Sequence, residues 1–190
     1  MNYLKLGLDH ILNLHAYDHL LFLFLLILPL FKMPVWSLVK LVTAFTIGHA
    51  ITLVIAMNTL SGQLIYITEI LIPVTIILAG MKSFANRKAK YIPRSYYYMV
   101  GVFGLIHGLG FAAAIKSMMM DEESVVGPLF QFNIGVEMGQ IIVLLIYLFV
   151  LKLVTMLFLK LSAQMYYSYI FKGMAIMGML MAVWMIVDRV

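Results

Sequence analysis

The sequence contains no cysteine and few charged residues, and both absences narrow what the chain can do. Of its 190 residues, 11% are charged and 64% are hydrophobic, and the mean hydropathy is +1.04. A soluble domain carries roughly 25% charged residues, so this chain is not built for water. Without cysteine there are no disulfides and no thiolate ligands, and the redox compartment stays open. The net charge of +5 comes mainly from one basic loop, so we expect no nucleic-acid partner.

Long hydrophobic runs are what the sequence has instead. A helix needs about 20 residues to cross a hydrocarbon core of ~30 Å. Six runs reach that scale, and none shows the alternation of a β-strand. The sequence therefore predicts an all-α integral membrane protein, a single domain over residues 1–190, in which a short amphipathic helix at 3–14 leads into a bundle of six transmembrane helices. The predicted spans lie near 17–32, 36–57, 64–83, 97–117, 128–158 and 167–187.

The distribution of basic residues predicts the orientation of this bundle in the lipid bilayer. Residues 84–96 form a short loop rich in Lys and Arg, and such loops stay cytoplasmic. Lys32 and Lys160 mark two further connections on the same side. The opposite side has the uncharged connection 58–63 and the acidic connection 121–123. We expect both termini outside, in a multi-pass protein of the bacterial inner membrane.

Ionisable side chains in five of the predicted spans gather in the outer half, whereas the inner half has almost none apart from Lys40, Lys152 and Lys172 near helix ends. Depth follows from the rise of about 1.5 Å per helical residue. An isolated charged group in the membrane costs at least about 2.5–3.5 kcal/mol, so such residues face the bundle interior and find partners there. A shared depth on five helices needs a common cause. The residues are His15, Asp18 and His19, then His49, Glu69, His107 and Glu137, with Asn133 beside the last.

Local spacing supports a shared polar interior. Glycines surround His107, and small residues let helix backbones approach closely. Three stretches place polar side chains on one helical face at intervals of three or four residues. These are His15 with Asp18 and His19, Thr43 with Thr46, His49 and Thr52, and Asn133 with Glu137 and Gln140.

Imidazole and carboxylate together are the ligand set of Zn²⁺, Ni²⁺, Co²⁺ or Fe²⁺. We therefore predict an outward-facing site for a divalent metal ion, supported by the polar residues Thr46, Asn133 and Gln140. Taken singly, an intramembrane His or Glu is equally compatible with a structural hydrogen bond. His10 and His15 are also compatible with an ordinary position at the outer interface. The set of five helices, not any single residue, carries this prediction.

Five segments in a fixed order carry a resemblance to a known family. They are "HILNLHAYDHLLFL" (10–23), "LVTAFTIGHAITL" (41–53), "TEILIP" (68–73), "FGLIHGLGFA" (103–112) and "FNIGVEMGQ" (132–140). Over nearly its whole length the chain resembles the HupE/UreJ family of small polytopic membrane proteins, and within it a branch common in Bacteroidetes-type bacteria. Members are regarded as permeases for nickel or related cations, with about six helices. The resemblance implies metal-handling positions at His10, Asp18, His19, His49, Glu69, His107 and Glu137.

Three functions are compatible with these residues. The first, which we favour, is a permease that binds a divalent cation in the outer half. The inner half, however, has no series of ionisable residues leading from the site to the cytoplasm. The second is an intramembrane zinc-dependent hydrolase with Glu69 or Glu137 as general base, although no HExxH helix is present. The third is a scaffold in which the polar residues only pair with one another. The metal, the coupling ion and the oligomeric state do not follow from the sequence.

Overall fold

The structure is a computed structural model, and it describes residues 2–13, 16–59, 61–85, 91–119, 122, 124–157 and 169–189. The sequence predictions for His15 and for the loop residues Arg87, Lys88, Lys90, Asp121, Glu123 and Lys160 lie outside these ranges. Throughout the described part the secondary structure is helical, as predicted. The helices are α1 (Tyr3–Leu12), α2 (Tyr17–Ile27), α3 (Val35–Thr59), α4 (Gly62–Ala85), α5 (Arg94–Met118), α6 (Val126–Leu157) and α8 (Phe171–Arg189).

Five of these helices (α3, α4, α5, α6 and α8) are long and apolar enough to cross a membrane. Helices α1 and α2 meet at 67° and would add a sixth span if the bent pair is counted as one. The predicted all-α membrane bundle is confirmed in this form. The ends of the five long helices lie within four residues of the predicted bounds.

The first predicted span is shorter than expected. Helix α2 ends at Ile27 instead of residue 32, and a turn follows it. Pro29 explains the early end, because proline lacks an N–H and its ring clashes with the carbonyl four residues earlier. Eleven helical residues rise about 16 Å, roughly half of the ~30 Å hydrocarbon core. Helix α2 alone therefore does not span a bilayer.

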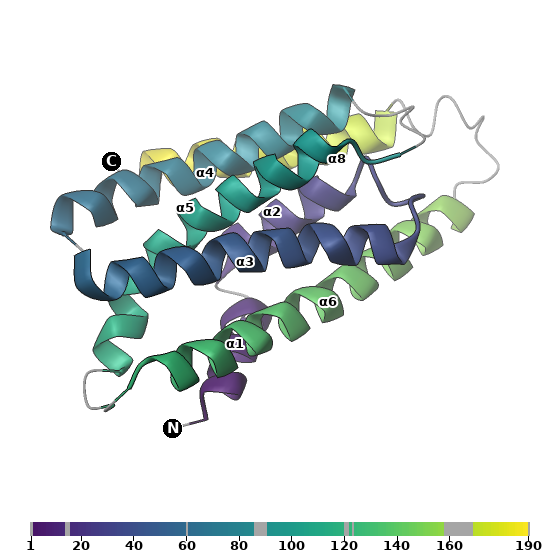
Figure 1. Ribbon diagram of the computed structural model, residues 1–190. Coiled ribbons are helices and arrows are strands. Elements are labelled where there is room, and N and C mark those ends of the chain that lie inside the picture. The colour runs from purple at the N-terminus through teal and green to yellow at the C-terminus, as the bar shows by residue number, and fades with distance from the viewer. Residues whose placement is uncertain are drawn as a thin grey trace.

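Helix α2 lies inside the bundle and not against lipid. It contacts α4, α6 and α8, and Figure 1 shows it among the longer helices. A helix that is apolar all round is stable where protein surrounds it. Asp18 and His19 stand at its start, and His19 is buried within the protein. The residues it buries are His19, Phe22, Leu23, Leu25, Leu26 and Ile27.

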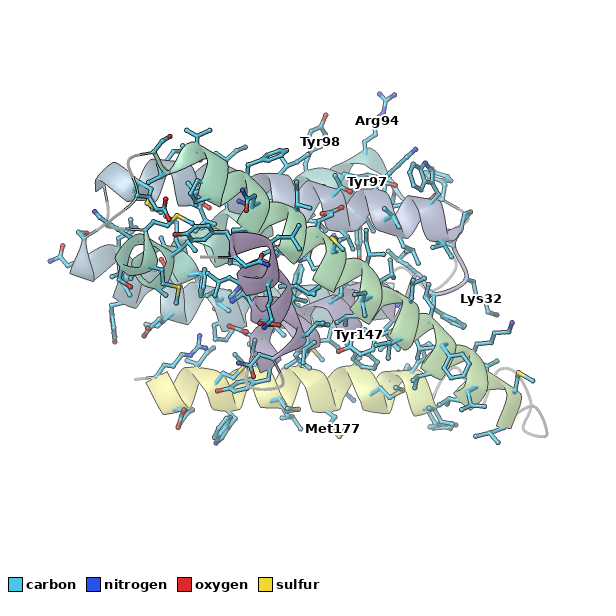
Figure 2. The ribbon with its side chains drawn as sticks, turned by 90° about the horizontal axis from the view of Figure 1, so that it is seen from below. Lys32, Arg94, Tyr97, Tyr98, Tyr147 and Met177 are labelled. Atoms are coloured by element: carbon cyan, nitrogen blue, oxygen red, sulfur yellow. The ribbon has the colours of Figure 1, made fainter. Side chains whose placement is uncertain are left out.

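The long helices turn apolar side chains outward and carry their few buried polar residues on the inner face. On α3 the exposed side chains include Ile47, Ile51 and Val54, whereas His49 is fully buried. On α8 Met177 projects away from the bundle (Figure 2) with 63% of its surface exposed. Soluble proteins rarely expose large continuous apolar surfaces. The outer face is therefore the face that lipid covers.

Glycines set the closest helix contacts, and these contacts position the polar residues. A Cβ at Gly104 of α5 would overlap the carbonyl oxygen of Phe45 on α3. A Cβ at Gly7 of α1 would overlap the carbonyl oxygen of Phe132 on α6. Both helix pairs thus pack backbone against backbone, as small residues permit. The prediction that glycines bring α5 close to its neighbour is confirmed.

The helix ends that adjoin the basic residues lie at one end of the bundle. Helices α2, α4 and α6 end at the end of the bundle where α3 begins, and α3 and α8 end at the opposite one (Figure 1). Lys32 and Arg94 lie in the same half of the molecule (Figure 2). The assignment of that half to the cytoplasm stays a prediction.

Candidate metal centre

Three imidazoles from three helices converge inside the bundle. His10 belongs to α1, His19 to α2 and His49 to α3, and one ring nitrogen of each lies within 4.8 Å of the other two. The ring centroids are 4.7 Å apart for His10 and His19, and 6.2 Å apart for His10 and His49. We call these residues the imidazole trio.

Each imidazole of the trio has one buried nitrogen without a hydrogen-bond partner. The Nε2 atoms of His10, His19 and His49 are all buried, and none has a hydrogen-bond partner. Leaving one such polar atom unsatisfied costs about 1–3 kcal/mol. Three together mark a place where another species is expected to bind.

Neighbouring side chains fix which nitrogen of two of these rings carries the proton. The Asp18 carboxylate only accepts, so Nδ1 of His19, 3.0 Å away, donates to it. The Asn133 amide donates through Nδ2 to the Leu129 carbonyl at 2.7 Å, which turns its oxygen toward Nδ1 of His49 at 3.2 Å. His49 therefore also donates through Nδ1. Both rings keep an unprotonated Nε2, the arrangement in which outer partners orient metal-binding histidines.

A fourth histidine lies beside the trio. The Thr75 hydroxyl has one proton and donates it to the Ile72 carbonyl at 2.7 Å, so it accepts from Nε2–H of His107 at 2.9 Å. The Nδ1 atom of His107 is then unprotonated, and it is buried without a partner. Its ring lies 5.2 Å from that of His19. His107 thus offers a further ligand atom next to the trio, although it is not one of the three mutually close residues.

The donor set fits a first-row transition metal. In tetrahedral sites with metal–nitrogen bonds of about 2.0–2.1 Å, ligand nitrogens are about 3.3 Å apart. Ligand atoms no more than 4.8 Å apart reach that spacing when the rings shift by about 1 Å. Aromatic rings line part of the site: the ring centroid of Phe111 lies 4.0 Å from that of His10, and the ring centroid of Phe132 lies 6.2 Å from that of His49. Such apolar side chains limit the access of water on their side.

A cavity of about 400 Å³ leads to this centre. The imidazoles of His10, His19 and His107 line it, together with the carboxylates of Asp18 and Glu69. Glu69 is exposed, so the cavity reaches the surface there. Negative groups at an entrance raise the local concentration of cations.

Arg189, at the end of α8, also lines the cavity. Its guanidinium donates to the backbone carbonyl of Glu69 at 2.7 Å and lies 3.9 Å from Asp18 Oδ2. Sequence reasoning missed both Arg189 and Thr75. A cation in the last turn of the last span was a usable signal for Arg189, whereas nothing in the sequence links Thr75 to His107.

The remaining predicted residues lie along the contact between α3 and α6. Thr43 donates to Oε1 of Glu137 at 2.6 Å, Thr46 contacts Oε2 of the same carboxylate, and Thr46 Oγ1 lies 2.9 Å from Oε1 of Gln140. We call these four residues the oxygen cluster. It begins about one helical turn from His49 and is distinct from the trio. The predicted metal site is therefore divided between two places, with Glu69 in the cavity between the trio and the surface.

Comparison with known proteins agrees with this architecture. No curated protein and no solved structure matches the chain. A family model described as HupE / UreJ protein matches residues 1–188, which is essentially the whole chain. That family is associated with the transport of nickel or other cations. The chain, a multi-pass membrane protein with a histidine cluster able to hold a metal ion, belongs to the HupE/UreJ family.

Proposed function

We propose that the protein is a permease of the bacterial inner membrane for a divalent transition-metal cation, and that the imidazole trio is its cargo-binding site. One observation carries the proposal: three imidazoles converge, and the buried Nε2 atom of each has no hydrogen-bond partner. Neutral imidazole suits Ni²⁺, Zn²⁺, Co²⁺ and Fe²⁺, and the family association favours nickel among them. His107 would supply an additional nitrogen when the rings close on the ion.

The entry route follows from the cavity. A cation that arrives from outside meets Glu69 at the exposed rim, then Asp18, then the trio. Alternating access would then open the trio toward the half that we assign to the cytoplasm.

A binding experiment tests the site. The purified full-length protein, stripped of metal, is dialysed against Ni²⁺, Zn²⁺, Co²⁺ or Fe²⁺ and its metal content is measured. We expect about one ion per chain, held less tightly in His49→Ala. Ile47→Ala, a change on the lipid face of the same helix, is the matched control. If no metal binds under any condition, the polar residues only pair with one another, and the scaffold function replaces this proposal.

A transport experiment tests the activity. The protein is reconstituted into vesicles that contain a metal-sensitive dye, and external Ni²⁺ or Co²⁺ is added. We expect uptake that His49→Ala abolishes and Ile47→Ala leaves intact. Binding without uptake would contradict the permease function while leaving the metal site in place.

The cavity also supports a second function. Three imidazoles with an open side and carboxylates nearby are the ligand set of hydrolytic zinc enzymes. In that case Glu69, which shares the cavity with His10 and His19, would be the general base, since Glu137 is not among its lining residues. Hydrolysis by the purified protein, lost on chelation and restored by one metal, would favour the enzyme. Its absence, together with uptake into vesicles, would favour the permease.

A further inference from the structure

The oxygen cluster is a second polar site in which every side-chain atom in contact is oxygen. Its contacts join Thr43 to Glu137, Thr46 to Glu137 and Thr46 to Gln140. Thr46 and Gln140 are deeply buried, with 8% and 3% of their surfaces exposed. A carboxylate within the bundle is thus held by oxygen atoms from α3 and α6.

With the Gln140 oxygen turned toward Thr46, the hydrogens in this cluster are too few for its contacts. Three contacts between side-chain oxygens share two hydroxyl protons, one on each threonine. The same two hydroxyls also lie 3.0 Å from the Val39 carbonyl and 3.2 Å from the Val42 carbonyl. Rotating the Gln140 amide would give that contact its own N–H donor. It would still leave the charge on Glu137 without a positive partner.

Among the described residues, no basic side chain forms an ion pair with Glu137 within 4.0 Å. A carboxylate left alone in a membrane is costly, which is why intramembrane charges are normally paired. One positive charge at the cluster would remove that cost. The carboxylate, amine, imidazole and phenol side chains on the helices packed against α6 are Tyr3, Lys5, Asp9 and His10 on α1, Tyr17, Asp18 and His19 on α2, and Lys40 and His49 on α3.

We propose that the oxygen cluster binds a monovalent cation, a proton or Na⁺, that couples to passage of the metal. A single positive charge neutralises the one carboxylate. Oxygen ligands favour such a hard ion, whereas the cargo prefers imidazole. The carboxylate and the two threonine hydroxyls would hold it, with the Gln140 oxygen completing the set.

The position of the cluster explains how the two ions communicate. Thr46 precedes His49 by one helical turn on α3, and Glu137 follows Asn133 by one turn on α6. Asn133 is the residue that orients His49. A cation that changes the spacing of α3 and α6 at Glu137 therefore changes the His49 ring one turn away. The coupling, unlike the binding of the cation itself, rests on the permease function proposed above.

The first experiment measures the cation site without transport. Infrared spectra of the full-length protein in vesicles are recorded for the natural sequence and for Glu137→Gln, and their difference isolates the Glu137 carboxyl. A neutral carboxylic acid band indicates a bound proton. A carboxylate band that shifts when Na⁺ replaces K⁺ indicates bound sodium. An ionised carboxylate that does not respond to Na⁺ overturns the proposal.

The second experiment measures the coupling. Co²⁺ uptake into vesicles is followed with an imposed Na⁺ gradient or an imposed pH gradient. We expect one gradient to change the rate by about fivefold or more, and Glu137→Gln to remove that dependence. Asp9→Asn, an exposed carboxylate on α1 that pairs with Lys5, is the matched control and keeps it.

The readouts separate the two proposals. Metal binding by Glu137→Gln should stay within about twofold of the natural protein, because the trio is intact. If Glu137→Gln instead loses Co²⁺ binding, Glu137 is a cargo ligand and the coupling proposal is overturned. If the rate of Co²⁺ uptake depends on neither gradient, the coupling proposal is overturned and the permease function is retained. No uptake at all overturns the permease, and the infrared result still decides whether the cluster holds a cation.

Discussion

His49 and Thr46 lie one turn apart on α3 and face the same neighbour, α6, yet they belong to sites of different chemistry. At His49, two more helices contribute imidazoles, and the ligand atoms are nitrogens without protons. At Thr46, the partners are Glu137 and Gln140, and the atoms in contact are oxygens. Polar residues on one face of a helix can thus contribute to two ion sites. The side chains that neighbouring helices place beside each residue decide which ion binds there.

The largest expected effect comes from removing a nitrogen of the trio. His49→Ala should weaken metal binding by more than about 100-fold. Even the loss of a residue that only hydrogen-bonds to a metal ligand lowers affinity about 10- to 100-fold. Equilibrium dialysis with elemental analysis measures it. The loss should be confined to the trio, so the infrared signature of Glu137 should persist. If both disappear together, the two clusters are one site and the comparison fails.

The next effect concerns the orientation of the His49 ring. Asn133→Ala removes the acceptor for Nδ1–H, so the ring loses its fixed tautomer and its direction. We expect metal affinity to fall by about 10- to 100-fold, less than for the loss of the ligand itself. Isothermal titration of the purified protein with Ni²⁺ gives the value. Unchanged affinity would mean that packing against Phe132 alone orients the ring.

A packing change tests how much the backbone contact between α3 and α5 stabilises the bundle. Gly104→Ala places a methyl group on the Phe45 carbonyl and forces α5 away from α3. Overpacking of this kind costs about 1–3 kcal/mol, so Tm should fall by several degrees. Thermal unfolding in detergent measures it. Gly62→Ala is the control, because open space surrounds Gly62.

The smallest effect is expected at the threonines. Thr43→Val keeps the shape of the side chain and removes one hydroxyl from Glu137. We expect metal binding to be unchanged and the gradient dependence of uptake to fall, although less than in Glu137→Gln. Side-by-side uptake assays in vesicles would show this order. An effect on metal binding would contradict the separation of the two clusters.

Much of the fold follows from the sequence because hydrophobic length and basic loops report directly on a bilayer. The long helices lie where the runs predict them. The exception is α2, where Pro29 ends the helix inside an apolar run that continues past it. Hydropathy alone does not predict where this helix ends, since the residues on either side of Pro29 are apolar.

The site was predictable only in part. Spacing identified the polar faces that carry His49 and Glu137, and a shared depth grouped them. Depth, however, is resolved to about one helical turn at best, and one turn is the distance between the two clusters. The division into a nitrogen site and an oxygen site was therefore below the resolution of the sequence argument.

The sequence by itself determined the solvent, the helical class and the polar side chains that need partners, because each follows from the cost of placing charge or unpaired backbone in lipid. The tertiary structure decided which of those side chains meet. Helix α1 packs on α6 through Gly7, and α2 starts inside the bundle, so His10 and His19 reach His49. Those approaches depend on contacts between residues far apart along the chain, which no local pattern records.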